Sequence, residues 1–126
     1  MKMPDHLKYT NEHEWISVEG DVATVGITSF AQGELGDIVF VEIETEGETL
    51  AKGETFGTIE AVKTVSDLFM PVGGKVVEIN PALEASPELV NKDPFGAGWL
   101  IKLAISDAAE LNDLLSAAQY EAMLGA

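Results

Sequence analysis

Residues 54–80 constrain the fold most, because they predict a β-hairpin with a lysine at its tip. Apolar side chains recur before Lys63 at Phe56 and Ile59, and strand-like residues resume at Val65. Short β-rich runs bounded by Gly, Pro, Asp and Ser are the usual signature of paired strands. The tip lacks the Asn-Gly or Asp-Gly pair that marks a two-residue turn, so the turn type stays open.

The rest of the chain also consists of short runs between glycine-containing turns. We expect strands at about residues 8–10, 15–18, 22–27, 38–44, 75–79 and 99–105. This spacing favours a compact barrel or sandwich over β-α-β units. The sequence therefore predicts a mainly β fold in one domain over residues 1–126, with a short internal helix and a C-terminal helix at about 107–124.

Capping residues indicate where these two helices begin. Thr28 or Ser29 can cap the internal helix, and Gly36 can end it. Asp107 can cap the C-terminal helix, with Glu110 at the capping-box position. Leucines and alanines recur on one face of that second helix, which predicts packing against a sheet.

The charge balance restricts the partners. The chain has 7 lysines, no arginine and 22 acidic residues, for a net charge of −15. Phosphate neutralisation needs clustered cations, so neither nucleic acid nor an anionic membrane is an expected partner. A partner with a basic patch would be attracted, although the acidity could equally serve solubility alone.

The chain has no cysteine, so it has no thiol chemistry of its own. Any redox role must come from an attached group. The N-terminal residues contain no signal-peptide core or transit segment, and no apolar run is long enough to span a bilayer. We expect a cytoplasmic protein, or one of the mitochondrial matrix if the source is eukaryotic.

Most surface lysines are only solvated charges, but the position of Lys63 suggests more. It is the only cation between Lys52 and Lys75, with carboxylates nearby at Glu60 and Asp67. A protruding turn would present its amine to a modifying enzyme. A group attached there could then move through solvent.

The tip sequence Glu60-Ala61-Val62-Lys63-Thr64 resembles that of the glycine cleavage H-protein family, whose tip is Glu-(Ser/Ala)-Val-Lys-(Ala/Thr/Ser). Ala61 and Thr64 differ from the commonest version, but the lysine is retained. The similarity extends over nearly the whole chain. Five further landmarks follow in family order: His13-Glu14-Trp15, Gly26-Ile27-Thr28, Ala31-Gln32, Leu35-Gly36-Asp37 and Gly98-Trp99-Leu100.

The resemblance implies a carrier and not an enzyme. The family's fold is a flattened lipoyl/biotinyl-type barrel-sandwich hybrid, and lipoic acid would be attached covalently to Lys63. The arm would carry the aminomethyl intermediate of glycine between glycine decarboxylase, aminomethyltransferase and dihydrolipoyl dehydrogenase. A lipoate ligase or a lipoyl/octanoyl transferase would attach the cofactor, and we expect a monomer.

The resemblance also implies roles for three acidic residues. The family places Glu14 and Asp67 near the loaded arm, and Glu60 belongs to the motif offered to the lipoylating enzyme. Glu12 stands where some members carry Ser. The competing interpretation is that these side chains are merely solvated.

Other carriers fit the sequence less well. Biotinyl modules usually have Met on both sides of the lysine, where this chain has Val62 and Thr64. Lipoyl modules of 2-oxoacid dehydrogenases usually have Asp before the lysine and are tethered by a linker. A lipoyl-carrier paralogue for lipoate relay or sulfur oxidation, and an unmodified acidic binding protein, remain open alternatives.

No self-contained catalytic or metal site is predicted. His6 and His13 lie among carboxylates, but none of the usual metal-ligand spacings occurs. The chain also lacks a Gly-x-Ser-x-Gly elbow and a glycine-rich phosphate loop.

Overall fold

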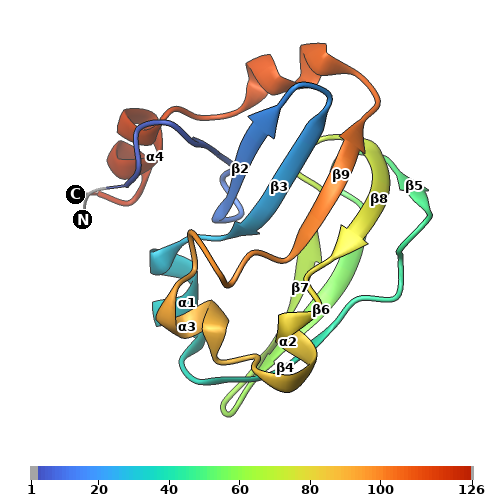
Figure 1. Ribbon diagram of the computed structural model, residues 1–126. Helices are drawn as coiled ribbons and strands as arrows, with labels where there is room; N and C mark the ends of the chain where they lie inside the picture. Colours follow the sequence, from blue (N-terminus) through green and yellow to red (C-terminus); the bar gives the residue numbers. More distant parts are fainter. Residues whose placement is uncertain (1–2, 126) are drawn as a thin grey trace.

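The computed structural model describes residues 3–125, which form two antiparallel sheets with helices at their ends (Figure 1). The larger sheet has six strands in the order β1-β2-β3-β9-β8-β5. Its strands are β1 (Lys8–Tyr9), β2 (Glu14–Glu19), β3 (Val22–Ile27), β5 (Thr49–Leu50), β8 (Gly74–Ile79) and β9 (Ile101–Ile105). The smaller sheet has the order β4-β6-β7, from β4 (Ile38–Glu42), β6 (Thr55–Ala61) and β7 (Val65–Phe69).

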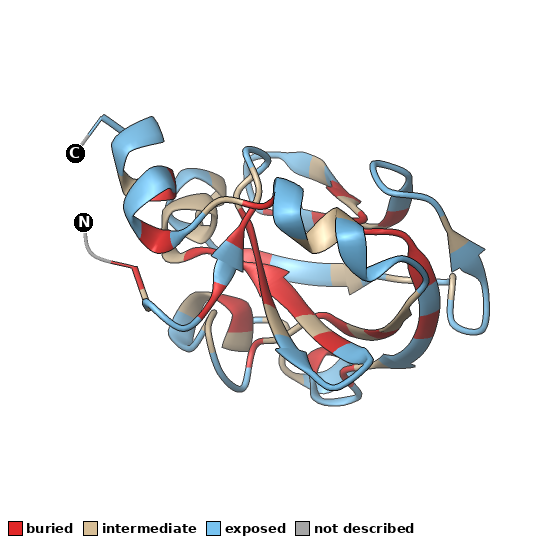
Figure 2. Ribbon diagram, turned by 90° about the horizontal axis from the view of Figure 1, so that it is seen from above, coloured by how far each residue is buried: buried red, intermediate tan, exposed pale blue. Residues whose placement is uncertain are grey.

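The main core fills the space between the two sheets. It joins Val25 and Leu103 of the larger sheet to Ile59 and Leu68 of the smaller one, all of them buried. Figure 2 shows these buried segments along the strands, with the exposed residues outside. The prediction of a mainly β fold is confirmed, and the sheets do not close into a barrel.

Within residues 3–125, three short helices lie between strands, and a 3₁₀ helix and a fourth α-helix follow the last strand. They are α1 (Ser29–Leu35), α2 (Ala82–Ala85), α3 (Leu89–Lys92), η1 (Ala108–Asp113) and α4 (Ala117–Met123). Helix α1 begins as predicted, with the Thr28 hydroxyl accepting a hydrogen bond from the Ala31 amide at 3.2 Å. It ends at Gly36, whose φ of 83° suits a residue without a side chain.

The prediction of one continuous C-terminal helix over 107–124 is wrong. The backbone of Leu115 exchanges two hydrogen bonds with Tyr9, at 2.7 and 2.8 Å, and this pairing separates η1 from α4. The Glu110 carboxylate does not complete a capping box, because it accepts from the Gly73 amide instead. The capping box lies at Ser116 and Gln119, before α4.

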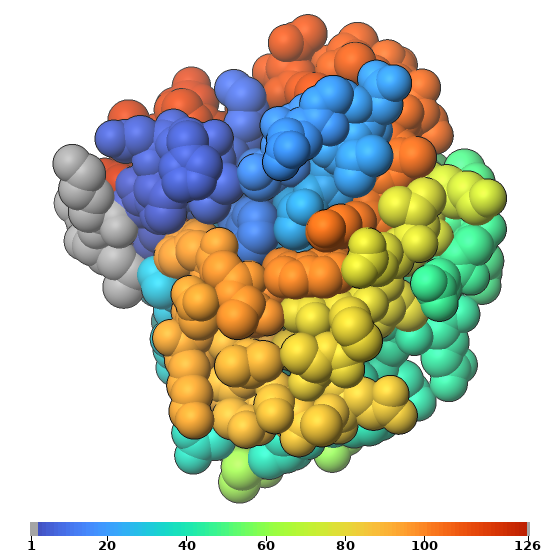
Figure 3. Space-filling view, viewed as in Figure 1, coloured from blue at the N-terminus to red at the C-terminus, as the bar shows by residue number. Residues whose placement is uncertain are grey.

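A second core forms where the two chain ends meet. Met3, Tyr9 and Trp15 pack there with Ala117 and Tyr120 of α4. Figure 1 shows α4 beside the N-terminal segment, at the opposite side of the molecule from the β6–β7 hairpin tip. The hairpin tip, at the lower edge of Figure 3, therefore projects away from this second core.

Candidate functional site

The predicted hairpin exists, and Lys63 lies exposed at its tip between β6 and β7. The Ala61 amide donates to the Thr64 carbonyl at 2.7 Å, leaving Val62 and Lys63 as the turn residues. Among the described non-glycine residues only His13 has a positive φ. The turn is therefore not of type I′ or II′, because both types need a positive φ.

The tip is held against the end of α1. The Val62 amide donates to the Asp37 carbonyl at 3.0 Å. A Cβ placed on Gly36 would lie 3.4 Å from Cε of Lys63, so the lysine stem runs over this glycine. The hairpin backbone is anchored while the amine remains in solvent.

The carboxylates near Lys63 in sequence do not bind it. Within residues 3–125 the salt bridges are Lys52–Asp113 at 3.4 Å and Lys102–Glu78 at 3.9 Å. Glu60 lies exposed on β6, opposite Val65. The Lys63 amine is thus open to an acylating enzyme.

A groove of about 460 Å³ runs beside β7, the outer strand of the smaller sheet. One wall is β7 itself, including Asp67 and Leu68. Helix α1 supplies another wall through Phe30 and Leu35. Glu12, His13 and Glu14 close the remaining side, so the groove brings together the two predicted arm contacts, Glu14 and Asp67, and adds Glu12 and His13.

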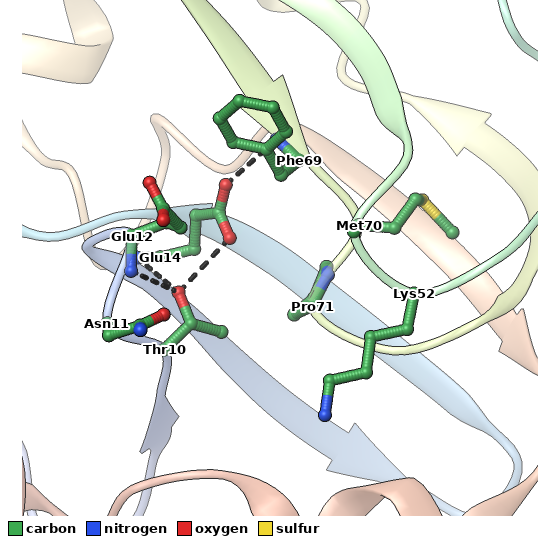
Figure 4. A pocket seen from close by; sticks show the side chains of 9 residues that line it. Thr10, Asn11, Glu12, Glu14, Lys52, Phe69, Met70 and Pro71 are labelled. Atoms are coloured by element: carbon green, nitrogen blue, oxygen red, sulfur yellow. Dashed lines mark hydrogen bonds between the residues drawn. The ribbon is translucent and has the colours of Figure 1, made fainter.

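Glu14 is not a solvated carboxylate, because the residue is only 2% exposed. Its Oε2 accepts a hydrogen bond from the Phe69 amide at 2.9 Å, and its Oε1 accepts from the Thr10 hydroxyl at 3.1 Å (Figure 4). Burial, with a smaller contribution from the nearby charge of Glu12, raises the pKa of Glu14 to about 7. The two hydrogen bonds oppose this shift, because they stabilise the charged form.

A second cavity of about 310 Å³ lies on the other side of this carboxyl group. It shares Glu12, Glu14 and Phe69 with the groove and extends toward Lys52 (Figure 4). Glu14 therefore lies where the groove and the second cavity meet. The Phe69 backbone contact could not be predicted, because no side-chain pattern marks which amide an edge strand leaves free.

The described residues contain no cluster of three or more potential metal ligands. No helix in the described part is long and apolar enough to cross a membrane.

Comparison with known proteins decides the family. The family model for the glycine cleavage H-protein matches residues 7–126. The chain belongs to the glycine cleavage H-protein family. It is therefore a lipoyl carrier in glycine cleavage and is not itself catalytic, and the family in general binds lipoate.

Individual relatives agree along the full length. The glycine cleavage system H protein of Bacteroides fragilis is 67% identical over 126 residues, which is all of both chains. That of Staphylococcus haemolyticus is 55% identical over 125 residues, 99% of each. The crystal structure of the H protein from Mycobacterium marinum superimposes with a TM-score of 0.89 at 42% identity, covering 98% of this chain and 100% of that one.

The burial of Glu14 predicts a pH-dependent stability. Its pKa rises from 4.5 in the unfolded chain to about 7 in the folded protein, so the folded protein retains this proton between those pH values. The resulting stabilisation is complete below pH 4.5 and is lost as the pH rises through 7. Glu14→Gln stays uncharged, so its unfolding free energy relative to the parent should increase by about 3 kcal/mol between pH 4.5 and 8.

Urea unfolding of both proteins at the two pH values measures this difference. Glu42→Gln, which changes an exposed carboxylate of β4, serves as the control and should show no such trend. A Glu14→Gln difference that is constant with pH would show that Glu14 titrates normally.

Proposed function

We propose that Lys63 is the lipoylation site, in amide linkage through its Nζ, and that the arm docks in the groove beside β7. The single observation that carries this proposal is an exposed lysine at an anchored tip, with no salt bridge in the described chain, next to a groove of about 460 Å³. When bound, lipoic acid would supply the dithiol chemistry that a chain without cysteine lacks.

The distance between the hairpin tip and Glu14 suits a lipoyl-lysine arm better than a lysine side chain alone. Val65 begins β7 close to the tip, and Phe69, which donates to Glu14, lies four residues further on. Four strand residues span about 13 Å, farther than a lysine side chain alone can reach. A lipoyl-lysine arm running along β7 would bring its free end toward Glu14.

Glu14 and Asp67 would then hold a cationic load. Asp67 lies along the groove wall, and Glu14 lies where the groove meets the second cavity. Because the pKa of Glu14 is about 7, this carboxyl group can lose its proton when an ammonium group approaches. Apolar side chains from α1 and β7, among them Phe30 and Leu68, would exclude water from the same space.

Our proposal includes the enzymes that use this arm. The arm would be used in turn by glycine decarboxylase, aminomethyltransferase and dihydrolipoyl dehydrogenase. The names of the relatives, which refer to the glycine cleavage system, support this part of the proposal. A lipoate ligase or lipoyl/octanoyl transferase would recognise the tip, with the exposed Glu60 as one contact. We further propose a single lipoyl-binding domain that is monomeric and cytoplasmic.

Lys63→Arg should fold normally and accept no lipoyl group, because the guanidinium is not a substitute for the neutral amine that attacks the activated acyl group. Lipoylation of the parent removes one positive charge and takes the net charge from −15 to −16. Intact mass after co-expression with a lipoate ligase measures the modification. Lys75→Arg, on β8, is the control and should be lipoylated fully; lipoyl mass on Lys63→Arg would refute the assignment.

Asp67→Asn should increase the loss of formaldehyde and ammonia from the glycine-loaded protein several-fold, because one carboxylate near the amine is neutralised. Glu42 offers a matched control, since Glu42, Thr58 and Asp67 occupy one row across the sheet. Glu42 lies on the other outer strand and does not contact the groove. Equal loss rates for Asp67→Asn and Glu42→Gln would remove Asp67 from the site.

A further inference from the structure

Three consecutive residues, Glu12, His13 and Glu14, all line the groove. Glu12 and His13 belong to the turn that precedes β2, and Glu14 is the first residue of that strand. The turn contains a left-handed residue, because the φ of His13 is 68°. The conformation of His13 therefore sets how the chain carrying Glu12 enters β2 at Glu14.

This conformation is unfavourable for a non-glycine residue, so its surroundings must hold it. The His13 amide donates to the Thr10 carbonyl at 3.1 Å, and its carbonyl accepts from the Thr28 amide at 3.0 Å. The ring of His13 lies 4.9 Å from that of Phe30. Its Nδ1 is 2.8 Å from the hydroxyl of Tyr120, which comes from α4.

The Tyr120 hydroxyl also contacts the residue at the start of α1. It lies 2.8 Å from the hydroxyl of Thr28, the residue that caps α1. Tyr120 is fully buried, and burial raises the pKa of its hydroxyl, which therefore stays protonated and able to donate. One hydroxyl group thus connects the His13 wall of the groove to the start of the α1 wall.

We propose that Tyr120 is a positioning residue of the arm groove: its hydroxyl fixes His13 and Thr28 relative to each other and so sets the placement of Glu12 and Glu14. The C-terminal helix is then part of the site, although none of its residues lines the groove. The ligand that this arrangement suits is an amide-linked arm with a cationic end, and that part of the inference rests on the proposed function.

Tyr9 provides a closely matched control. The rings of Tyr9 and Tyr120 stack with centroids 4.9 Å apart and an interplanar angle of 11°, and both residues are fully buried. The Tyr9 hydroxyl, however, donates to the Pro4 carbonyl at 2.7 Å and has no contact with the groove. Tyr9→Phe and Tyr120→Phe each remove one buried hydroxyl from the same pair of rings.

The first measurement uses the unmodified protein and is independent of lipoylation. Heteronuclear NMR of Tyr120→Phe should show altered ring ¹⁵N and backbone Cα and Cβ shifts at His13, and altered amide shifts at Glu12 and Glu14. Tyr9→Phe should leave these signals unchanged. Unchanged His13 signals in Tyr120→Phe, or equal changes in the two variants, would overturn the proposal.

The same substitution in a His13→Gly protein distinguishes a positioning role of Tyr120 from general destabilisation of the fold. In His13→Gly the backbone can adopt a positive φ without strain, so adding Tyr120→Phe should no longer shift the signals of Glu12 and Glu14. A persistent shift in the double variant would refute the proposed route through His13. Should Tyr120→Phe not fold, Thr28→Val against Thr28→Ser removes the other partner of the Tyr120 hydroxyl. Because Thr28→Val also removes the α1 cap, the readout is the amide shifts of Glu12 and Glu14 and not those of α1, and unchanged shifts at Glu12 and Glu14 would overturn the proposal.

The loaded protein gives the functional readout. Glycine-loaded Tyr120→Phe should lose its load several-fold faster than the parent, and Tyr9→Phe should match the parent. If Lys63 proved unmodified, the proposed function would fail while the NMR comparison still decided the role of Tyr120. Equal loss rates for the two tyrosine variants would limit Tyr120 to a structural role and contradict the proposal.

Discussion

One part-buried hydrogen bond connects the two sheets at the place where the function is proposed. Glu14 begins β2 of the larger sheet, and its carboxyl group accepts from the Phe69 amide on β7 of the smaller sheet at 2.9 Å. An outer strand leaves every second amide unpaired, and a buried unpaired amide would cost about 1–3 kcal/mol. The contact therefore satisfies the β7 backbone and keeps a carboxyl group of raised pKa at the end of the groove.

The proposed carrier role combines a backbone-anchored hairpin with one exposed side chain, Lys63. Backbone contacts of Val62 and Ala61 hold the tip, whereas the Lys63 amine has no salt bridge in the described residues. These backbone bonds would present the lysine to a partner enzyme from a defined place on the surface. The net charge of −15 would steer the protein toward basic clefts, an effect on encounter rate more than on affinity.

Local patterns predicted much of this architecture, because the relevant signals lie close together in the sequence. The hairpin around Lys63, the start of α1 at Thr28 and its end at Gly36 all follow from short motifs. The structure of the C-terminal region does not follow from short motifs. There the pairing of Leu115 with Tyr9 joins residues distant in sequence and overrides the helical pattern.

The site shows the same division between local and long-range information. Family resemblance suggested Glu14 and Asp67, and the structure places both along one groove. The burial of Glu14 and its bond to Phe69 depend on how the two sheets pack, which no local motif specifies. The positive φ of His13 is likewise invisible to a period-two strand pattern, and its contact with Tyr120 spans most of the chain.

The most direct test compares two enzymes on one lipoylated preparation of the protein. With glycine decarboxylase it should support exchange of bicarbonate into the carboxyl carbon of glycine, at a rate that falls as salt rises. It should be a poor acceptor for the first component of pyruvate dehydrogenase, because the surfaces outside the hairpin differ from those of a bare lipoyl module. Efficient reductive acylation by the pyruvate enzyme without glycine exchange would contradict the account, as would failure with both enzymes despite full lipoylation, which would indicate a lipoate-relay or sulfur-oxidation carrier.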